Sequence, residues 1–206
     1  VCAINSIRRG SLALLETSII SLSKTYEKSF KEIKAAGNGF GIKRQFLVEE
    51  LVPSTVKGQE GTKLSKLREL KAGETLSVGQ KIVVRYSISS DENRCLVHVR
   101  TPYNACLRPI RQLSDNYGYA LRSWRINGAA RGFNAWWITP QGYREVRDSV
   151  IDYWFDVYPE HNTTIEDEFY VSQAGVFTAP VCEIESLYAP HYRANSASDG
   201  SLTVKE

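Results

Sequence analysis

The chain has 206 residues, a length that suits one domain or one domain with an appendage. Its hydrophobic share of 42% and its charged share of 24% are those of an ordinary globular protein and argue against a disordered chain. The net charge of +3 is too small to indicate a nucleic-acid partner, and no apolar run reaches the roughly 20 residues of a membrane-spanning helix.

The N-terminal residues carry neither an initiating methionine nor a signal peptide. Methionine is absent even at position 1, and Val1–Asn5 lacks the charged and apolar regions of a signal peptide. We therefore expect a mature or excised fragment, with any export signal outside this sequence.

Apolar residues near the start recur at steps of three and four, which predicts an amphipathic helix over Ser11–Lys34. Ser11 is a suitable N-cap and Gly37–Gly39 is a suitable stop. A helix lying on a membrane surface is a weaker alternative, because acidic residues interrupt the basic face. We expect residues 1–38 to be a helical lead or the remnant of a preceding domain, and residues 39–206 to be one β-domain.

After Gly41 the pattern changes to that of strands. Ile42–Val48 is predicted to be a strand, and the lysine- and glycine-rich segment Pro53–Gly79 is predicted to be a loop. Ile82–Ile88 alternates at period two, as in a half-buried strand. The next strand follows a turn at 91–93 and ends at Pro102, and we expect its inward face to carry Cys95, Val97 and Val99.

Short strand patterns continue to the C-terminus. They are predicted at Cys106–Leu113, Tyr143–Arg147, Val150–Val157, Ile165–Ser172 and Ser201–Lys205. Asn116–Phe133 is expected to be a long loop or mobile hairpin. Ala174–Tyr192 is expected to form one long late strand, opened by Gly175 and closed by Pro190, that completes a sheet with earlier strands.

Short strands separated by Gly and Pro turns predict a mainly β fold, an antiparallel β-sandwich with the N-terminal amphipathic helix attached. The order of the strands argues against a parallel α/β sheet, which needs helices between its strands.

The cysteines form no metal motif. Cys2, Cys95, Cys106 and Cys182 include no C-x-x-C pair and no histidine at a zinc-finger offset, so we expect no metal site. Two alternatives stay open for Cys95, Cys106 and Cys182: they are buried small hydrophobic residues, or two of them form a disulfide.

No catalytic motif is apparent. His98, His161 and His191 pair with no serine or cysteine in an elbow motif, and there is no P-loop. We therefore expect no enzyme activity, no catalytic residue and no cofactor. A hydrolase with an unrecognised site that depends on His191 is a third hypothesis.

The tryptophans leave an alternative function open. Trp124, Trp136, Trp137 and Trp154 are of the residue type that forms glycan-binding platforms. The alternative function is therefore a stand-alone surface β-sandwich module that binds glycan or protein ligands, although aromatic residues in sandwiches are mostly core.

Four stretches carry a family pattern in a fixed order. They are Leu76–Arg85, Leu96–Val99 with Ala105–Pro109, Tyr143–Ser149 with Tyr153–Asp156, and Gly175–Phe177 with Ser186–Tyr192. Together, over residues 39–206, they resemble the C-terminal macroglobulin-like domain of bacterial alpha-2-macroglobulins, whereas residues 1–38 match poorly.

The resemblance implies a non-catalytic C-terminal domain of an endopeptidase inhibitor, in which a protease cuts a bait segment and is trapped as the molecule rearranges. The implied partners are the other domains of a longer parent protein and, through the parent, target proteases. The implied location is extracytoplasmic: periplasmic, anchored to the cell envelope through the parent, or secreted. The resemblance implies that this segment itself does not contact a membrane.

The resemblance also implies a site. In many members a Met-Tyr pair on the last domain covers a reactive thioester in another domain, and Leu187-Tyr188 occupies that place here. Leu187 keeps an apolar cover but lacks the flexible thioether of methionine. The thioester motif Cys-x-Glu-Gln is absent from this sequence. The two residues are thus expected to shield a thioester or form a domain interface, the alternative being that Tyr188 is a strand-end aromatic packed on its neighbour.

Overall fold

The fold is known from a computed structural model that describes residues 29, 32–53, 63–111, 115–116, 124–126, 142–159, 163–178 and 180–206. The regular elements of this described part are β-strands, and it contains no α-helix. The predicted helix lies mostly outside the described residues. Near its predicted end, the carbonyl oxygens of Ile33 and Lys34 accept hydrogen bonds from Ser198 and Asn195.

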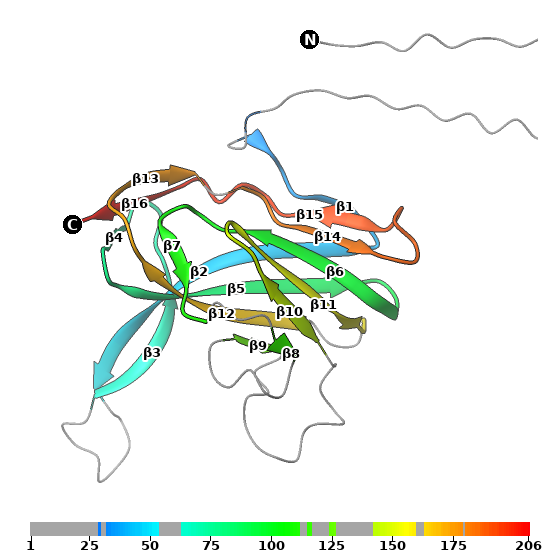
Figure 1. Cartoon of the computed structure of the whole chain (residues 1–206), viewed down its shortest axis with the longest axis horizontal. Helices are drawn as coiled ribbons and strands as arrows, with labels where there is room; N and C mark the ends of the chain where they lie inside the picture. The colour runs from blue at the N-terminus through cyan, green and yellow to red at the C-terminus, as the bar shows by residue number, and fades with distance from the viewer. Residues whose placement is uncertain are drawn as a thin grey trace, which may run out of the picture.

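The first sheet has seven strands, all antiparallel to their neighbours. In spatial order they are β1 (Ala36–Asn38), β15 (Arg193–Asn195), β14 (Glu183–Ser186), β6 (Arg94–Pro102), β11 (Val150–Val157), β10 (Tyr143–Val146) and β8 (Asp115–Asn116). In Figure 1 the strands β6, β11 and β10 of this sheet lie in front of β5 and β2.

The second sheet lies behind the first. Its order is β3 (Lys63–Glu69), β2 (Phe40–Pro53), β5 (Lys81–Ser90), β12 (Thr163–Val171) and β7 (Leu107–Pro109), with β9 (Trp124–Ile126) also paired to β12. The outer half of the β2–β3 hairpin extends away from the body of the domain (Figure 1). A small third sheet joins β13 (Gly175–Thr178), β16 (Ser201–Lys205) and β4 (Thr75–Ser77), and its β16–β4 pair is parallel.

The core fills the space between the two large sheets. Alternate residues of β11 face it, and Ile151, Tyr153 and Phe155 are at most 2% exposed. Tyr153 lies 6.1 Å from Tyr86 of the opposite sheet, centroid to centroid. Asp167 of β12 accepts hydrogen bonds from the Tyr153 hydroxyl at 2.7 Å and from Arg144 Nε at 2.8 Å. A buried ion pair therefore also joins the two sheets.

The antiparallel β-sandwich is confirmed. The strands predicted at Ile82–Ile88, Val150–Val157 and Ile165–Ser172 correspond to β5, β11 and β12, and the terminal strand Ser201–Lys205 is β16. Period-two alternation is reliable for these strands because one of their faces is buried against the core.

The predicted loop Pro53–Gly79 is wrong, because it contains β3 and β4. In the described part of the chain β3 lies at the edge of its sheet, next to β2, where charged side chains such as Lys66 and Arg68 can reach solvent.

The predicted single strand Ala174–Tyr192 is also wrong. The chain forms β13 in the third sheet and then β14 in the first. Pro180, which lacks the N–H that a continuous ladder needs, lies between the two strands. Pro190 lies in the turn that follows β14 rather than at the end of a long strand.

Candidate functional site

The turn between β14 and β15, residues Ser186–Tyr192, brings the predicted site residues to one end of the first sheet (Figure 1). The amide of Ser186 donates to the carbonyl oxygen of Tyr192 at 3.1 Å. Inside the loop the Ala189 amide donates to Ser186 at 3.2 Å and the Tyr192 amide donates to Ala189 at 2.9 Å. The turn is thus a compact, hydrogen-bonded structure.

Leu187 and Tyr188 lie at the tip of this turn and face solvent. Leu187 is 42% exposed and Tyr188 is 80% exposed. The sequence alternative, that Tyr188 packs on its neighbour at a strand end, predicts a covered ring, whereas the described ring is largely uncovered. Tyrosine combines a large apolar face with a polar tip, a chemistry that suits an interface.

A third exposed apolar residue is bonded to this turn through its backbone and was not found from the sequence. Leu96, in β6, is 40% exposed, and its carbonyl oxygen accepts a hydrogen bond from the Leu187 amide at 3.3 Å. Its backbone has a φ of 52°, a left-handed conformation that is rare for leucine. The Leu96 amide donates to Asp156 Oδ1 of β11 at 2.8 Å, which holds this irregular position in place.

The irregularity at Leu96 corrects the predicted face of Cys95. Opposite it, the β6–β11 register shifts between Phe155 and Val157, so that β6 carries a bulge. Cys95 and Leu96 are both exposed, and regular alternation resumes at the buried Val97. Cys95 therefore faces solvent instead of the core.

Arg94 packs against Tyr192, the last residue of the turn. Its guanidinium carbon lies 3.6 Å from the centroid of the Tyr192 ring and 5.3 Å from that of Phe40. The neighbouring ring of His191 lies 4.1 Å from that of Tyr192, centroid to centroid. No sequence motif indicated this cluster, because its members come from β6, β2 and the turn before β15.

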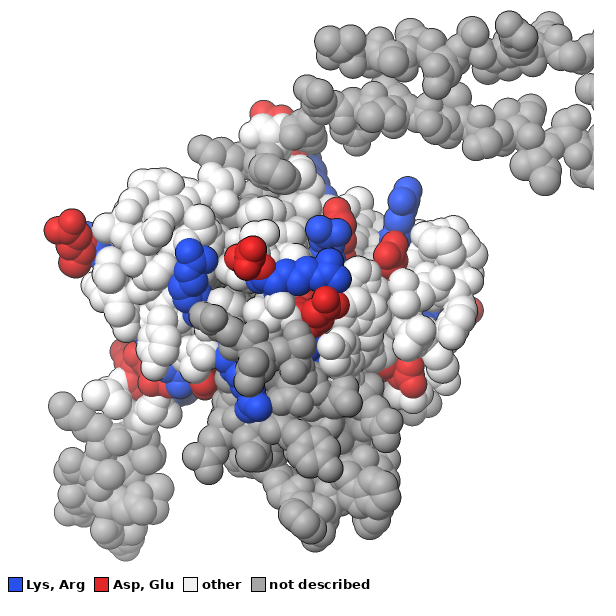
Figure 2. Space-filling view, in the orientation of Figure 1, with Lys and Arg blue, Asp and Glu red and all other residues white. Residues whose placement is uncertain are grey.

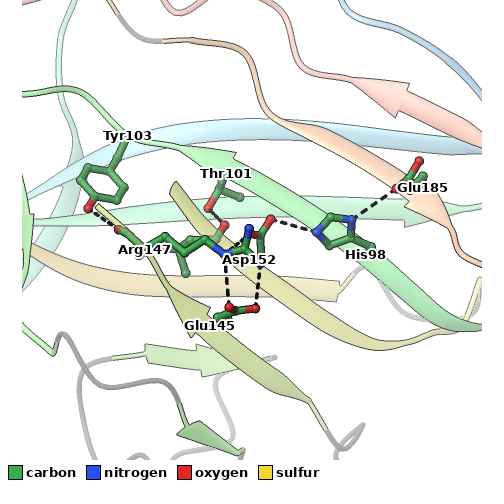
Figure 3. A network of polar contacts seen from close by, with 8 residues as sticks. His98, Thr101, Tyr103, Glu145, Arg147, Asp152 and Glu185 are labelled. Carbon is green, nitrogen blue, oxygen red and sulfur yellow. Dashed lines mark hydrogen bonds and ion pairs between the residues drawn. The ribbon is translucent and has the colours of Figure 1, made fainter. Parts of the chain in front are cut away.

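The outer face of the first sheet carries a polar network (Figure 3). His98 Nε2 lies 2.9 Å from Asp152 Oδ1, and His98 Nδ1 lies 3.3 Å from Glu185 Oε1. Arg147 Nε lies 3.6 Å from Asp152 Oδ2, and its Nη2 lies 3.1 Å from Glu145 Oε2. Both ring nitrogens of His98 thus face carboxylates, and no nucleophile lies beside them among the described residues.

A shallow hollow of about 550 Å³ opens beside this network, between β1, β6, β14 and β15. Its polar lining includes His98, Arg100, Glu183, Glu185 and Arg193. Figure 2 shows basic and acidic side chains interspersed on the face turned to the viewer, rather than gathered by sign.

Within the described part of the chain, no group of three or more His, Cys, Asp and Glu residues could hold a metal ion. In the same residues, no helix is long and apolar enough to cross a membrane.

The described cysteines form no disulfide, which corrects that alternative. Cys95, Cys106 and Cys182 are all free, the first exposed and the other two buried. Burial raises the pKa of the Cys106 thiol and of the Cys182 thiol to about 11. Cys106 and Cys182 lie in the core and therefore serve as small hydrophobic residues, whereas Cys95 faces solvent.

The tryptophans do not form a described platform. Trp154 lies on the outer face, where one side of its ring stacks on His98 at 4.9 Å and 10°. Tyr143 tilts against it at 5.7 Å. The side chains of Trp124, Trp136 and Trp137 lie outside the described part of the chain.

Comparison with known proteins agrees with the β-sandwich. The model of the bacterial alpha-2-macroglobulin MG10 domain family matches residues 39–191. A search of curated proteins gave no match.

Solved structures show the same fold. A native Escherichia coli alpha-2-macroglobulin has a TM-score of 0.60 at 19% identity, over 89% of this chain and 10% of that one. A Salmonella alpha-2-macroglobulin reacted with methylamine has a TM-score of 0.59 at 22% identity, over 84% of this chain and 10% of that one. A native E. coli fragment that runs from domain MG7 to the C-terminus has a TM-score of 0.58 at 17% identity, over 84% of this chain and 24% of that one.

This chain spans about a tenth of the length of the longer structures. Since the family model covers most of residues 39–206, the chain belongs to the bacterial alpha-2-macroglobulin family, as a macroglobulin-like domain of the MG10 type.

Proposed function

We infer that this domain is a non-catalytic C-terminal domain of an alpha-2-macroglobulin-like endopeptidase inhibitor. In it, the β14–β15 turn packs on a neighbouring thioester-type domain, and Leu187 and Tyr188 shield that domain from water. The observation that carries the proposal is the 80% exposure of the Tyr188 ring on a turn whose backbone is fixed by hydrogen bonds.

The surroundings of Tyr188 support docking. Its neighbour in sequence, Leu187, is also exposed, and so is Leu96, whose carbonyl oxygen accepts a hydrogen bond from the Leu187 amide. Exclusion of water from a thioester requires apolar and aromatic cover rather than charge. An interface anchored by an aromatic residue and flanked by aliphatic ones matches the composition of binding hot spots.

The rest of the domain supports a structural role. Of the two described histidines, His98 faces the carboxylates of Asp152 and Glu185, and His191 packs on Tyr192. Neither arrangement activates a nucleophile. We propose that the partners of the domain are the other domains of its parent and, through the parent, target proteases, at an extracytoplasmic location.

The test uses the full-length protein that carries this domain. Methylamine attacks a thioester carbonyl, forms an amide and releases the cysteine as a free thiol, which can be counted colorimetrically. If Tyr188 shields the thioester, Tyr188→Ala removes most of the aromatic cover, and the rate of thiol release rises by roughly tenfold or more.

A matched control is Tyr170→Ala, because Tyr170 is 48% exposed on β12, in the other sheet. This control is expected to leave the rate unchanged, and both variants are expected to keep the melting temperature of the wild type. Equal rates in the two variants, or no thiol release from any of them, contradict the shielding role.

The location and context have a separate test. An antibody raised against this chain is expected to detect, in an extracytoplasmic fraction of the source cells, a band several times heavier than its 23.2 kDa. A cytoplasmic band near the mass of the chain itself would contradict the assignment to a large inhibitor.

A further inference from the structure

Arg94 stands where three separate parts of the chain meet. It opens β6 directly after the turn that follows β5, and its guanidinium lies over the rings of Tyr192 and Phe40. The side chain is only 7% exposed although it is charged. A guanidinium 3.6 Å from a ring centroid is in close cation–π contact, and the contact strengthens as water is excluded.

Arg94 also forms ion pairs with the turn that precedes β6. Its Nη2 lies 2.6 Å from Asp91 Oδ1 and 3.7 Å from Glu92 Oε2, whose side chains are 57% and 72% exposed. Ion pairs with such exposed carboxylates contribute little to stability. The Arg94 Nε is buried without a hydrogen-bond partner. The stacked rings and Asp91 together hold the guanidinium, and a lysine reproduces the charge but not the planar stack.

Tyr192 links the Arg94 side chain to the backbone of the turn. Its amide donates to Ala189 and its carbonyl oxygen accepts from Ser186, so both backbone groups of Tyr192 close the loop that contains Tyr188. On the same side, Asn38 Nδ2 donates to the carbonyl oxygen of His191 at 3.2 Å. A shift of the Tyr192 ring therefore displaces both hydrogen bonds that shape the tip.

At the tip the side chains of Leu187 and Tyr188 are exposed, so the backbone hydrogen bonds of the turn, including the bond from the Leu187 amide to Leu96, fix its orientation. A turn held in one orientation before docking loses less conformational entropy when it binds.

We propose that Arg94 is a positioning residue for docking: by stacking on Tyr192 it holds the Ser186–Tyr192 turn in the orientation that presents Tyr188. This inference rests on the proposed function of Tyr188. It adds a residue that stacks on Tyr192 and acts through the backbone of the turn.

The first experiment measures order in the turn of this chain. The variant is Arg94→Lys, and the matched control is Arg100→Lys, an exposed arginine farther along the same strand. In Arg94→Lys, hydrogen exchange at the amides of Ser186, Leu187 and Tyr192 is expected to quicken by about three- to tenfold. Exchange in β5 is expected to stay as in the wild type, and the control is expected to change nothing. Unchanged exchange at the three amides overturns the proposal.

The second experiment separates positioning from general stability. In the full-length protein, methylamine-driven thiol release is measured for Arg94→Lys, for Tyr188→Ala and for the double variant. Arg94→Lys is expected to speed release by about three- to tenfold when Tyr188 is present, and to add nothing in the Tyr188→Ala background.

The outcomes distinguish this inference from the function on which it rests. Equal acceleration by Arg94→Lys in both backgrounds shows that Arg94 does not act through Tyr188 and overturns the inference. No effect of Tyr188→Ala alone overturns the proposed function, and with it the docking role of Arg94. A normal effect of Tyr188→Ala with none of Arg94→Lys leaves the function intact and removes only the positioning residue.

Discussion

Gly39 lies directly against the ring of Tyr192: a Cβ atom on Gly39 would stand 2.7 Å from Tyr192 Cδ1 and 2.9 Å from Arg94 Nη2. Its φ of +76° is in the left-handed region, where glycine is favoured. Both the backbone and the space at this position therefore require glycine. The junction between β1 and β2 is built closely around the cluster that supports the β14–β15 turn.

The first prediction follows from that contact. Gly39→Ala is expected to lower the unfolding free energy by about 2–4 kcal/mol, because it adds a steric clash to the cost of a left-handed alanine. Gly73→Ala is the matched control, since Gly73 has a φ of +78° and nothing within 4 Å of its Cβ position. The control is expected to lose only about 1 kcal/mol in urea denaturation. Equal losses would show that the space beside Gly39 is not restrictive.

The second prediction concerns Leu96, whose φ of 52° places a leucine in the left-handed region. Asparagine tolerates this conformation better, so Leu96→Asn is expected to raise the unfolding free energy by about 0.5–1 kcal/mol. Leu96→Ala removes the same exposed side chain but keeps the unfavourable backbone, and it is expected to change stability little. A loss of stability in Leu96→Asn, measured by urea denaturation, contradicts a strained backbone at this position.

Regular strands could be predicted from the sequence where one face is buried. The alternation over Ile82–Ile88 and Val150–Val157 gave β5 and β11, because core residues recur at every second position in both strands. Strand β3 was missed because it lies at an edge, where lysine and arginine are tolerated on both faces. The break between β13 and β14 was missed because the segment contains two prolines, Pro180 and Pro190, and either of them can end a strand.

The candidate site divides in the same way. Leu187 and Tyr188 were found by resemblance, and the structure adds their exposure. The bulge at Leu96 has no sequence signal, because leucine is a poor residue for a positive φ. The contact of Arg94 with Tyr192 joins β6 to the end of the chain, and a single sequence does not reveal which distant strands lie side by side.

The third prediction concerns the thiols. In a Cys2→Ser background, about one thiol per native chain is expected to react with a colorimetric thiol reagent near pH 8, because a reactive thiol must be accessible and partly ionised. That thiol is Cys95, which is exposed, whereas burial raises the pKa of Cys106 and of Cys182 to about 11. Adding Cys95→Ser is expected to abolish native labelling, and denaturant is expected to restore the two buried thiols. Rapid native labelling of Cys106 or Cys182 contradicts their placement in the core.

The fourth prediction concerns pH and the turn between β3 and β4. Arg68 holds both oxygens of the Glu74 carboxylate, with Nη1 at 2.8 Å and Nη2 at 2.5 Å, and the Lys71 amide donates to the same group at 3.0 Å. The hydrogen bonds from Arg68 are the main cause that lowers the pKa of Glu74 from 4.5 to about 2. The folded state thus favours the ionised carboxylate. The stabilisation is complete above the unfolded pKa of 4.5 and is lost as the pH falls from there through about 2.

An NMR titration of the Glu74 side-chain carboxyl measures this directly. In Arg68→Gln its pKa is expected to return toward 4.5, because the charge-assisted bidentate pair is gone. Arg85→Gln is the matched control, since Arg85 pairs with Glu166 on β12 and leaves the turn untouched. A Glu74 that titrates near 4.5 in the wild-type chain would show that the bidentate pair does not persist in solution.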